Sequence, residues 1–154
     1  MLIEYKTTTQ EITGIHYGRA DEDAEVSAFS KSGYTLVKLA DEPTEGKYLK
    51  IVDGVESLAA VTAFDISASK SLITSEVHAY TYYSMISDNS DYIDFTDVPE
   101  GTSIYVDDMD TAAATGDASG TFRFKATEAG TYGIKFYKIG YNSMYLEVKA
   151  HDNL

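Results

Sequence analysis

Carboxylates are the side chains of this chain whose grouping could do chemistry. One group lies in a single predicted loop and consists of Asp107, Asp108, Asp110 and Asp117. A second group consists of Asp88, Asn89, Asp91, Asp94 and Asp97. Their oxygens are the hard ligands that calcium prefers, but neither group has the spacing of a helical calcium-binding loop. Turns also favour Asp and Asn, whose side chains bond to nearby backbone. We favour this turn-forming role and predict no metal site, with calcium binding as the alternative.

Catalytic patterns are hard to find in the sequence. The three histidines, His16, His78 and His151, are far apart, and two of them lie in strand-like runs with no neighbouring carboxylate in the alternation. The sequence has no Gly-x-Ser-x-Gly elbow, phosphate-binding loop, dinucleotide fingerprint or His-Glu-x-x-His helix. Cysteine is absent, which excludes disulfides and thiolate sites. We therefore predict a protein that is not an enzyme, with no catalytic residue and no cofactor.

Tyrosine is the residue type most suited to making contacts here, because the chain has thirteen tyrosines and no tryptophan. Tyr80 and Tyr82 are two residues apart in a strand-like run, so their rings are expected on one face, where they could form a flat platform for a sugar. Tyr137 and Tyr141 are further candidates for surface contact. The alternative for the first pair is packing under a neighbouring loop or subunit.

Charge limits the classes of partner. The 154 residues include 25 acidic and 12 basic side chains, for a formal net charge of -13. Such a charge repels phosphate backbones and anionic lipids, so we expect neither nucleic acid nor a membrane surface as partner. The chain has no apolar run of about 18 residues, and Met1 to Lys6 lack the features of a cleaved signal. We expect no membrane insertion and no visible secretion signal.

The elements that must position these side chains are β-strands. In the last third of the chain, apolar residues fall at every second position in three runs that begin near Phe122, Tyr132 and Met144. This period of two predicts strands with one face on a core, and we expect the three to form one antiparallel sheet. Further strands are predicted at 64–70, 77–85, 91–95 and 103–106. A loop is expected from Ala112 to Ser119.

The first 60 residues are predicted to form a small β unit of their own. Strands are expected at 2–6, 11–17, 34–40 and 47–52, the last two joined by a hairpin-type connection. The charged stretch Arg19 to Glu25 is predicted to be a solvated loop or a short exposed helical turn. Val55 to Ala63 is the segment in which a helix would be accepted.

The turn order of the second part resembles that of a bacterial-type immunoglobulin-like module. A Val98-Pro99-Glu100-Gly101 turn leads one strand, and Glu128-Ala129-Gly130-Thr131-Tyr132 opens a later one. The resemblance implies that Tyr132, beside Gly130, is a structural corner whose hydroxyl bonds to nearby backbone. It also implies an all-β fold, with a docking unit at 1–60 and an immunoglobulin-like β-sandwich at 61–154. The tryptophan and cystine of antibody domains are missing.

The whole chain also resembles small virion proteins of tailed bacteriophages, in which a β unit ending in a turn such as Val52-Asp53-Gly54 precedes a module of this kind. This resemblance implies a non-enzymatic structural component of a virion, assembled in the host cytoplasm. It could belong to the tail, neck, fibre or capsid decoration. Its partners would be other virion proteins and copies of itself. The alternative is a carbohydrate- or surface-binding module that contacts a host-surface glycan through exposed tyrosines.

Overall fold

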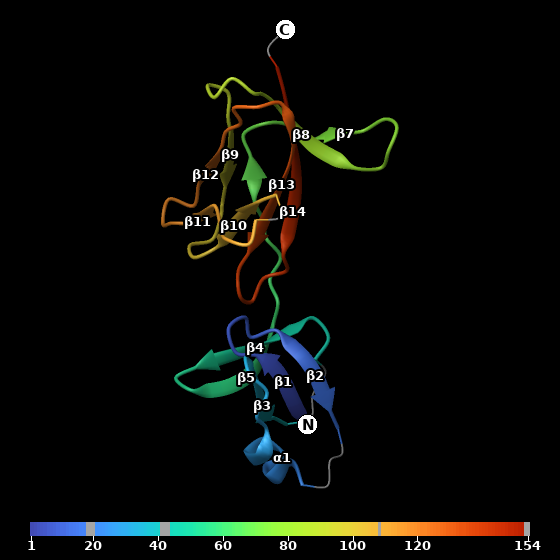
Figure 1. Ribbon diagram of the computed structural model, residues 1–154, viewed down its shortest axis with the longest axis vertical. Helices are drawn as coiled ribbons and strands as arrows, with labels where there is room; N and C mark the ends of the chain where they lie inside the picture. The colour runs from blue at the N-terminus through green and yellow to red at the C-terminus, as the bar shows by residue number, and fades with distance from the viewer. Residues whose placement is uncertain (18–20, 41–43, 108, 153–154) are drawn as a thin grey trace. The chain divides into compact units, whose positions relative to one another are not determined.

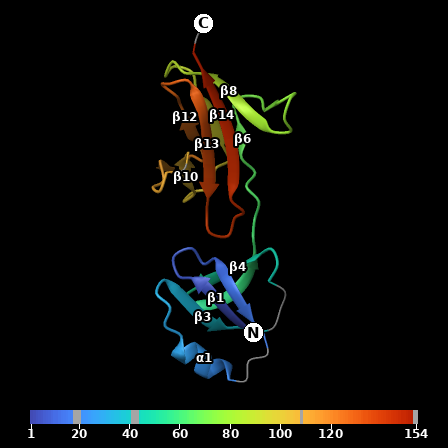
Figure 2. The same cartoon turned by 45° about the vertical axis from the view of Figure 1, so that its right-hand side comes forward.

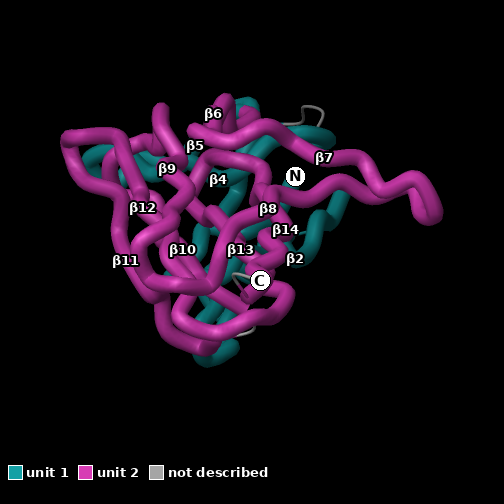
Figure 3. Tube along the Cα trace, turned by 90° about the horizontal axis from the view of Figure 1, so that it is seen from above, with its two compact units in different colours: residues 1–62 teal, residues 63–154 magenta. Residues whose placement is uncertain are grey.

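The protein is almost entirely β-structure. The computed structural model describes residues 1–17, 21–40, 44–107 and 109–152. These residues form strands and a single short helix, which confirms the predicted all-β class (Figure 1). The chain divides into two compact units, Met1–Thr62 and Ala63–Leu154, which Figure 3 shows in different colours. The division lies two residues beyond the expected boundary at residue 60.

The first unit contains a three-stranded antiparallel sheet. Strand β1 (Leu2–Lys6) lies between β2 (Ile12–His16) and β3 (Tyr34–Lys38). β1 is the most buried of the three and is central to the sheet, with Leu2 and Ile3 fully buried. Part of the predicted charged stretch belongs to helix α1 (Glu22–Ala28), where the Asp21 side chain accepts a hydrogen bond from the Ala24 amide at 3.0 Å. This bond caps the helix at its N-terminus.

A two-stranded hairpin completes the first unit. Strand β4 (Lys47–Val52) pairs with β5 (Val55–Ala60) through a turn at Asp53 and Gly54, whose φ angles are 50° and 77°. Two consecutive positive φ angles form the turn whose twist suits paired strands. The helix accepted for Val55 to Ala63 was therefore wrong. The predicted hairpin between the strands at 34–40 and 47–52 was also wrong, because β3 pairs with β1 and β4 with β5.

The second unit consists of two sheets. The large sheet has the order β11 (Ala114–Thr115), β10 (Ser103–Val106), β13 (Gly130–Tyr137), β14 (Met144–His151), β8 (Thr81–Ile86) and β7 (Ile73–Thr74). The small sheet has the order β12 (Phe122–Phe124), β9 (Ile93–Thr96) and β6 (Ser67–Ala68). β14 pairs with β13 in antiparallel and with β8 in parallel orientation, so these three strands run side by side (Figure 2).

The two sheets of the second unit share one hydrophobic core. Phe95 from the small sheet and Phe136 from the large sheet are fully buried, with ring centroids 5.8 Å apart in an edge-to-face arrangement. The same cluster contains Ile93, Ile104, Phe124, Ile134 and Val148. Because every strand that contributes to it alternates, the residues between the core positions point away from it. The unit is thus a layered pair of sheets with two outward surfaces.

Several predicted strands differ from the observed ones. β12 was expected in the same sheet as β13 and β14, but it pairs with β9 in the small sheet. Alternation shows that one side of a strand is buried, and both sheets bury that side in the same core, so the pattern does not distinguish them. The strand predicted at 64–70 is reduced to Ser67–Ala68, and the one predicted from Val77 begins at Thr81. The loop predicted at 112–119 contains the two-residue strand β11.

Candidate functional site

The outward side of the large sheet carries most of the residues suited to making contacts. We call it the outer face, and its side chains alternate with the buried Ile134, Phe136 and Val148. They include Tyr80, Tyr82, Tyr105, Lys135, Tyr137, Tyr145, Glu147 and Lys149. The turn that precedes β10 helps to position Tyr105, because the buried hydroxyl of Thr102 donates to the Pro99 carbonyl at 2.6 Å.

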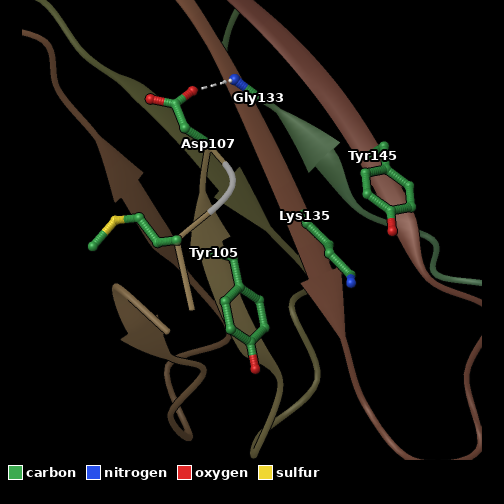
Figure 4. Close-up of a pocket in the computed structure, with 6 residues that line it drawn as sticks. Tyr105, Asp107, Gly133, Lys135 and Tyr145 are labelled. Carbon is green, nitrogen blue, oxygen red and sulfur yellow. Dashed lines mark hydrogen bonds between the residues drawn. The ribbon is translucent and has the colours of Figure 1, made fainter. Parts of the chain in front are cut away.

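A row of three side chains crosses the middle of the outer face. In the strand register, Lys135 lies opposite Tyr105 on β10 and opposite Tyr145 on β14. The Lys135 ammonium lies 5.7 Å from the centroid of the Tyr105 ring and 5.5 Å from that of Tyr145. A cation at this distance from aromatic rings is attracted to their faces. Figure 4 shows Lys135 extending between the two tyrosines.

A shallow hollow of about 560 Å³ lies along this row. It is lined by Tyr105, Asp107, Met109, Gly133, Lys135 and Tyr145. Gly133 leaves the hollow open, because a Cβ atom at this position would meet no other atom within 4 Å. The Asp107 carboxylate is held at one end, where its Oδ1 accepts a hydrogen bond from the Gly133 amide at 2.9 Å (Figure 4). The backbone amide of Asp107 donates in return to the Gly133 carbonyl at 2.6 Å.

Two large side chains that line this hollow are exposed to solvent. Tyr145 is 69% exposed and Met109 is 53% exposed, although both are large and apolar. Among the described residues, no carboxylate lies within 4.0 Å of the Lys135 ammonium. The hollow therefore offers two aromatic rings, one cation and one carboxylate to the solvent. Sequence reasoning missed Tyr105 and Tyr145, although both occupy the polar parity of predicted strands and this signal could have identified them.

Tyr80 and Tyr82 do lie on one face, but they surround a side chain of the same unit. Their ring centroids are 5.9 Å apart and the rings are tilted by 39°, so the pair does not form a flat platform. The Lys149 ammonium lies 4.7 Å from the Tyr80 ring and 4.3 Å from the Tyr82 ring, and donates to the Tyr80 hydroxyl at 2.5 Å. This hydrogen bond raises the pKa of Lys149. A second hollow, of about 460 Å³, extends from Tyr80 to Tyr145 and Gly133.

The other two predicted contact tyrosines are half-buried. The Tyr141 ring lies 4.8 Å from that of Phe64, a residue packed against the core, and the Lys138 ammonium is 5.4 Å from it. Tyr137 ends β13 opposite Ser103. Neither residue belongs to the row formed by Tyr105, Lys135 and Tyr145. Of the four predicted tyrosines, Tyr80 and Tyr82 are neighbours, whereas Tyr141 packs on Phe64.

Tyr132 makes the backbone bond expected of it. Its hydroxyl donates to the Glu128 carbonyl at 2.9 Å, and its ring packs edge-on against Phe124 with centroids 5.4 Å apart. Gly130 lies beside this ring, where an added Cβ would come within 3.7 Å of it. The bond joins the beginning of β13 to the segment that connects it to β12 of the small sheet.

Members of both carboxylate groups bond within turns, whereas Asp91 and Asp94 form ion pairs with Lys70 and Arg123. Asp88 accepts hydrogen bonds from the amides of Ser90 and Asp91 at 2.8 Å and from the Ser90 hydroxyl at 2.7 Å, which lowers the pKa of Asp88 to about 2. Asp117 accepts from the amide and hydroxyl of Ser119, and this lowers its pKa as well. Asp108 lies outside the described residues. Within the described ranges, no three His, Cys, Asp or Glu residues are grouped so that they could hold a metal ion.

Histidine is not among the described residues that line either hollow. His151 Nε2 is 2.8 Å from the Ser84 hydroxyl, across the parallel β14 and β8 pair. In a Ser-His-Asp triad, a carboxylate on the second ring nitrogen orients the imidazole. The neighbouring Asp152 accepts from Ser87 instead, and no other carboxylate among the described residues bonds to His151. His78 stacks on the Tyr80 ring, with centroids 6.1 Å apart.

The described part of the chain contains no helix that could span a lipid bilayer. No protein-family model, curated protein or solved structure matches the chain.

Proposed function

We propose that this chain is a non-enzymatic structural component of a tailed-phage virion, in which the first unit docks and the second presents or cements a surface. The proposal starts from the resemblance of its turn order to such proteins. It places the chain in the tail, neck, fibre or capsid decoration. The observation that supports it best is the strand order of the second unit.

That strand order agrees with an immunoglobulin-like arrangement. In such sandwiches one sheet has the order C′, C, F, G and the other contains A, B and E. The strands β11, β10, β13 and β14 and the strands β6, β9 and β12 have these orders and the same sequence along the chain, and β8 and β7 extend the large sheet beyond β14. The Tyr132 bond to Glu128, four residues upstream, corresponds to the tyrosine corner at the start of strand F. These features support an immunoglobulin-like unit without an inter-sheet disulfide.

The first unit exposes two apolar side chains at the tip of its hairpin. Val52 and Val55 flank the turn of the β4–β5 hairpin and are 49% and 67% exposed. A partner that covered these two side chains would remove apolar area from water, which favours association. We therefore assign the docking contact to this hairpin tip.

Virions from the genome that encodes this chain provide the test. Mass spectrometry of purified particles should find the chain at a fixed copy number, and its absence would overturn the proposal. Val55→Asp should reduce incorporation by at least about tenfold, because it places a charge in a buried contact. Ser57→Asp is the matched control, since it adds the same charge to an exposed position of the same hairpin. Equal loss in both variants would contradict docking through the tip.

A second candidate is a carbohydrate- or surface-binding module. The observation that favours it is the hollow of the outer face, where exposed rings and polar groups occur together. The two functions are compatible, because a virion protein that docks through one unit can bind a host-surface glycan with the other. Binding of a soluble glycan by the isolated full-length chain would distinguish the second role from purely structural presentation.

A further inference from the structure

We infer that the hollow between Tyr105 and Tyr145 is a binding site for a neutral oligosaccharide. The inference deepens the second candidate function and does not depend on the virion role. It assigns the ligand to Tyr105, Asp107, Gly133, Lys135 and Tyr145. It thereby differs from a platform made by Tyr80 and Tyr82, which Lys149 approaches more closely and bonds through the Tyr80 hydroxyl.

Aromatic rings provide the first part of the argument. Tyr105 and Tyr145 lie on two strands with β13 between them, so their backbones are about 10 Å apart at the usual strand spacing. A ring face carries partial negative charge and attracts the C–H groups on the apolar side of a sugar ring. Two such faces, two strand spacings apart, suit a chain of sugar units better than a single small molecule.

The polar groups provide the second part. The Lys135 ammonium is a donor with no carboxylate partner among the described residues, and the tyrosine hydroxyls can donate or accept. Asp107 uses Oδ1 to accept from the Gly133 amide, which leaves its other carboxylate oxygen as an acceptor. Donors and acceptors at the edges of apolar rings match a ligand that is rich in hydroxyl groups.

Charge decides between neutral and acidic sugars. Among its described lining residues the hollow presents a carboxylate, Asp107, as well as a cation, Lys135, so an acidic sugar would meet a like charge there. The chain as a whole carries a formal charge of -13, which repels an anionic ligand over distances up to the Debye length of about 8 Å at physiological salt. A neutral ligand avoids this repulsion. Its affinity should accordingly change little with salt.

Gly133 supplies the space. A side chain at this position would project from the sheet into the hollow, and nothing lies within 4 Å of the place its Cβ would occupy. Glycine weakens a strand interior, so its presence there is often associated with close approach of a ligand or another chain. Gly133→Val therefore gives a variant that fills the hollow with a residue well suited to a strand.

The experiment is calorimetric and NMR titration of the full-length chain with neutral pentasaccharides of glucose, galactose, mannose and N-acetylglucosamine. Oligogalacturonate serves as the acidic counterpart. We expect one neutral sugar to bind with a Kd on the order of 1 mM or tighter, with less than a twofold change between 50 and 500 mM salt, roughly as expected for uncharged ligands. Tyr145→Ala and Gly133→Val should each weaken binding by at least about tenfold.

Matched variants separate the site from general effects. Tyr145→Phe should retain most of the affinity, because the ring that stacks is kept. Tyr17→Ala, which removes a tyrosine of 57% exposure in the first unit, should have no effect. Circular dichroism and melting curves verify that each variant is folded.

Three results would overturn the inference. The first is that no neutral saccharide binds, and the second is that oligogalacturonate binds more tightly than every neutral sugar. The third is that Tyr145→Ala changes the oligomeric state while saccharides remain unbound, which would make the hollow a protein interface. All three leave the mass-spectrometric test of the virion role unaffected, so the failure of one proposal is distinguishable from the failure of the other.

Discussion

The two outward surfaces of the second unit use their cations differently. On the small sheet, Arg123 donates through Nε and Nη2 to both oxygens of Asp94, at 2.7 and 2.8 Å, and its guanidinium lies 3.9 Å from the centroid of the Tyr92 ring. On the outer face, Lys135 lies more than 5 Å from the centroids of two tyrosine rings, and no described carboxylate is within ion-pair distance. Arg123 on the small sheet is thus paired with a carboxylate of the same sheet, whereas Lys135 on the outer face keeps its ammonium hydrogens for a partner.

Alternation along a strand does not determine whether an exposed cation has a carboxylate partner. Both sheets bury one side in the same core and expose the other, and both expose a basic residue near tyrosine. The difference lies in the cross-strand neighbour. Arg123 lies opposite Asp94, while Lys135 lies between Tyr105 and Tyr145. Register therefore decides whether a cation is neutralised.

The largest expected effect comes from the core that both surfaces share. Phe136 is fully buried and its ring contacts those of Phe95 and Phe122. Phe136→Ala should lower the free energy of unfolding by about 3–5 kcal/mol, through lost burial and the cavity left behind. Tyr145→Ala, one strand away on the outer face, should change it by no more than about 0.5 kcal/mol. Urea denaturation measures both, and a cost above about 2 kcal/mol for Tyr145→Ala would make Tyr145 a structural residue.

Much of the second unit could be predicted because its signals are local. Apolar alternation identified the inward sides of β13 and β14, and the Pro and Gly residues near Val98 located the turn before β10. The assignment of β12 to a sheet could not be predicted, since it depends on pairing with β9 nearly 30 residues away. The strand β5 was missed because short apolar segments are ambiguous, although the Asp53-Gly54 turn before it favoured a hairpin.

The candidate site was harder to predict than the fold. Tyr80 and Tyr82 were identified from their parity, but their engagement with Lys149 depends on the parallel pairing of β8 with β14, which adjacent residues do not encode. Tyr105, Lys135 and Tyr145 come from three strands, and their row exists only once the register of all three is known. The alternation along one strand shows which side chains point outward, but not which side chains of other strands lie next to them.

A smaller effect is expected from the turn that joins the two sheets. Asp88 lies between β8 of the large sheet and β9 of the small one, and hydrogen bonds from Asp91, Ser90 and the backbone lower its pKa to about 2. A pKa lowered in the folded state stabilises the protein above the unfolded value of 3.8, and this contribution is lost as the pH falls toward about 2. Asp88→Asn should therefore lower the melting temperature at pH 6 and have progressively less effect below about pH 4.

A charge-matched control is needed, because removing any carboxylate from a chain of formal charge -13 relieves repulsion. Asp65→Asn makes the same change at an exposed position of the same unit. Its melting temperature should remain close to that of the unsubstituted protein, or slightly above it, at pH 6. If Asp88→Asn behaves in the same way at every pH, the turn bonds do not stabilise the fold, and the two sheets are joined without help from this carboxylate.

The smallest effect tests the comparison itself. Arg123→Gln removes a cation that makes a bidentate contact with Asp94 and lies over the Tyr92 ring. It leaves Asp94 without the hydrogen bonds from Arg123 that lower the pKa of Asp94. Lys135→Gln removes a cation that lies between two exposed rings. Both changes make the net charge more negative by one, so they have the same effect on overall repulsion. Calorimetric melting at low salt should show a small decrease for Arg123→Gln and almost none for Lys135→Gln, because exposed ion pairs contribute little and are weakened by salt. The opposite order would mean that the outer face is held together by Lys135. It would then be no freer to bind a partner than the surface of the small sheet.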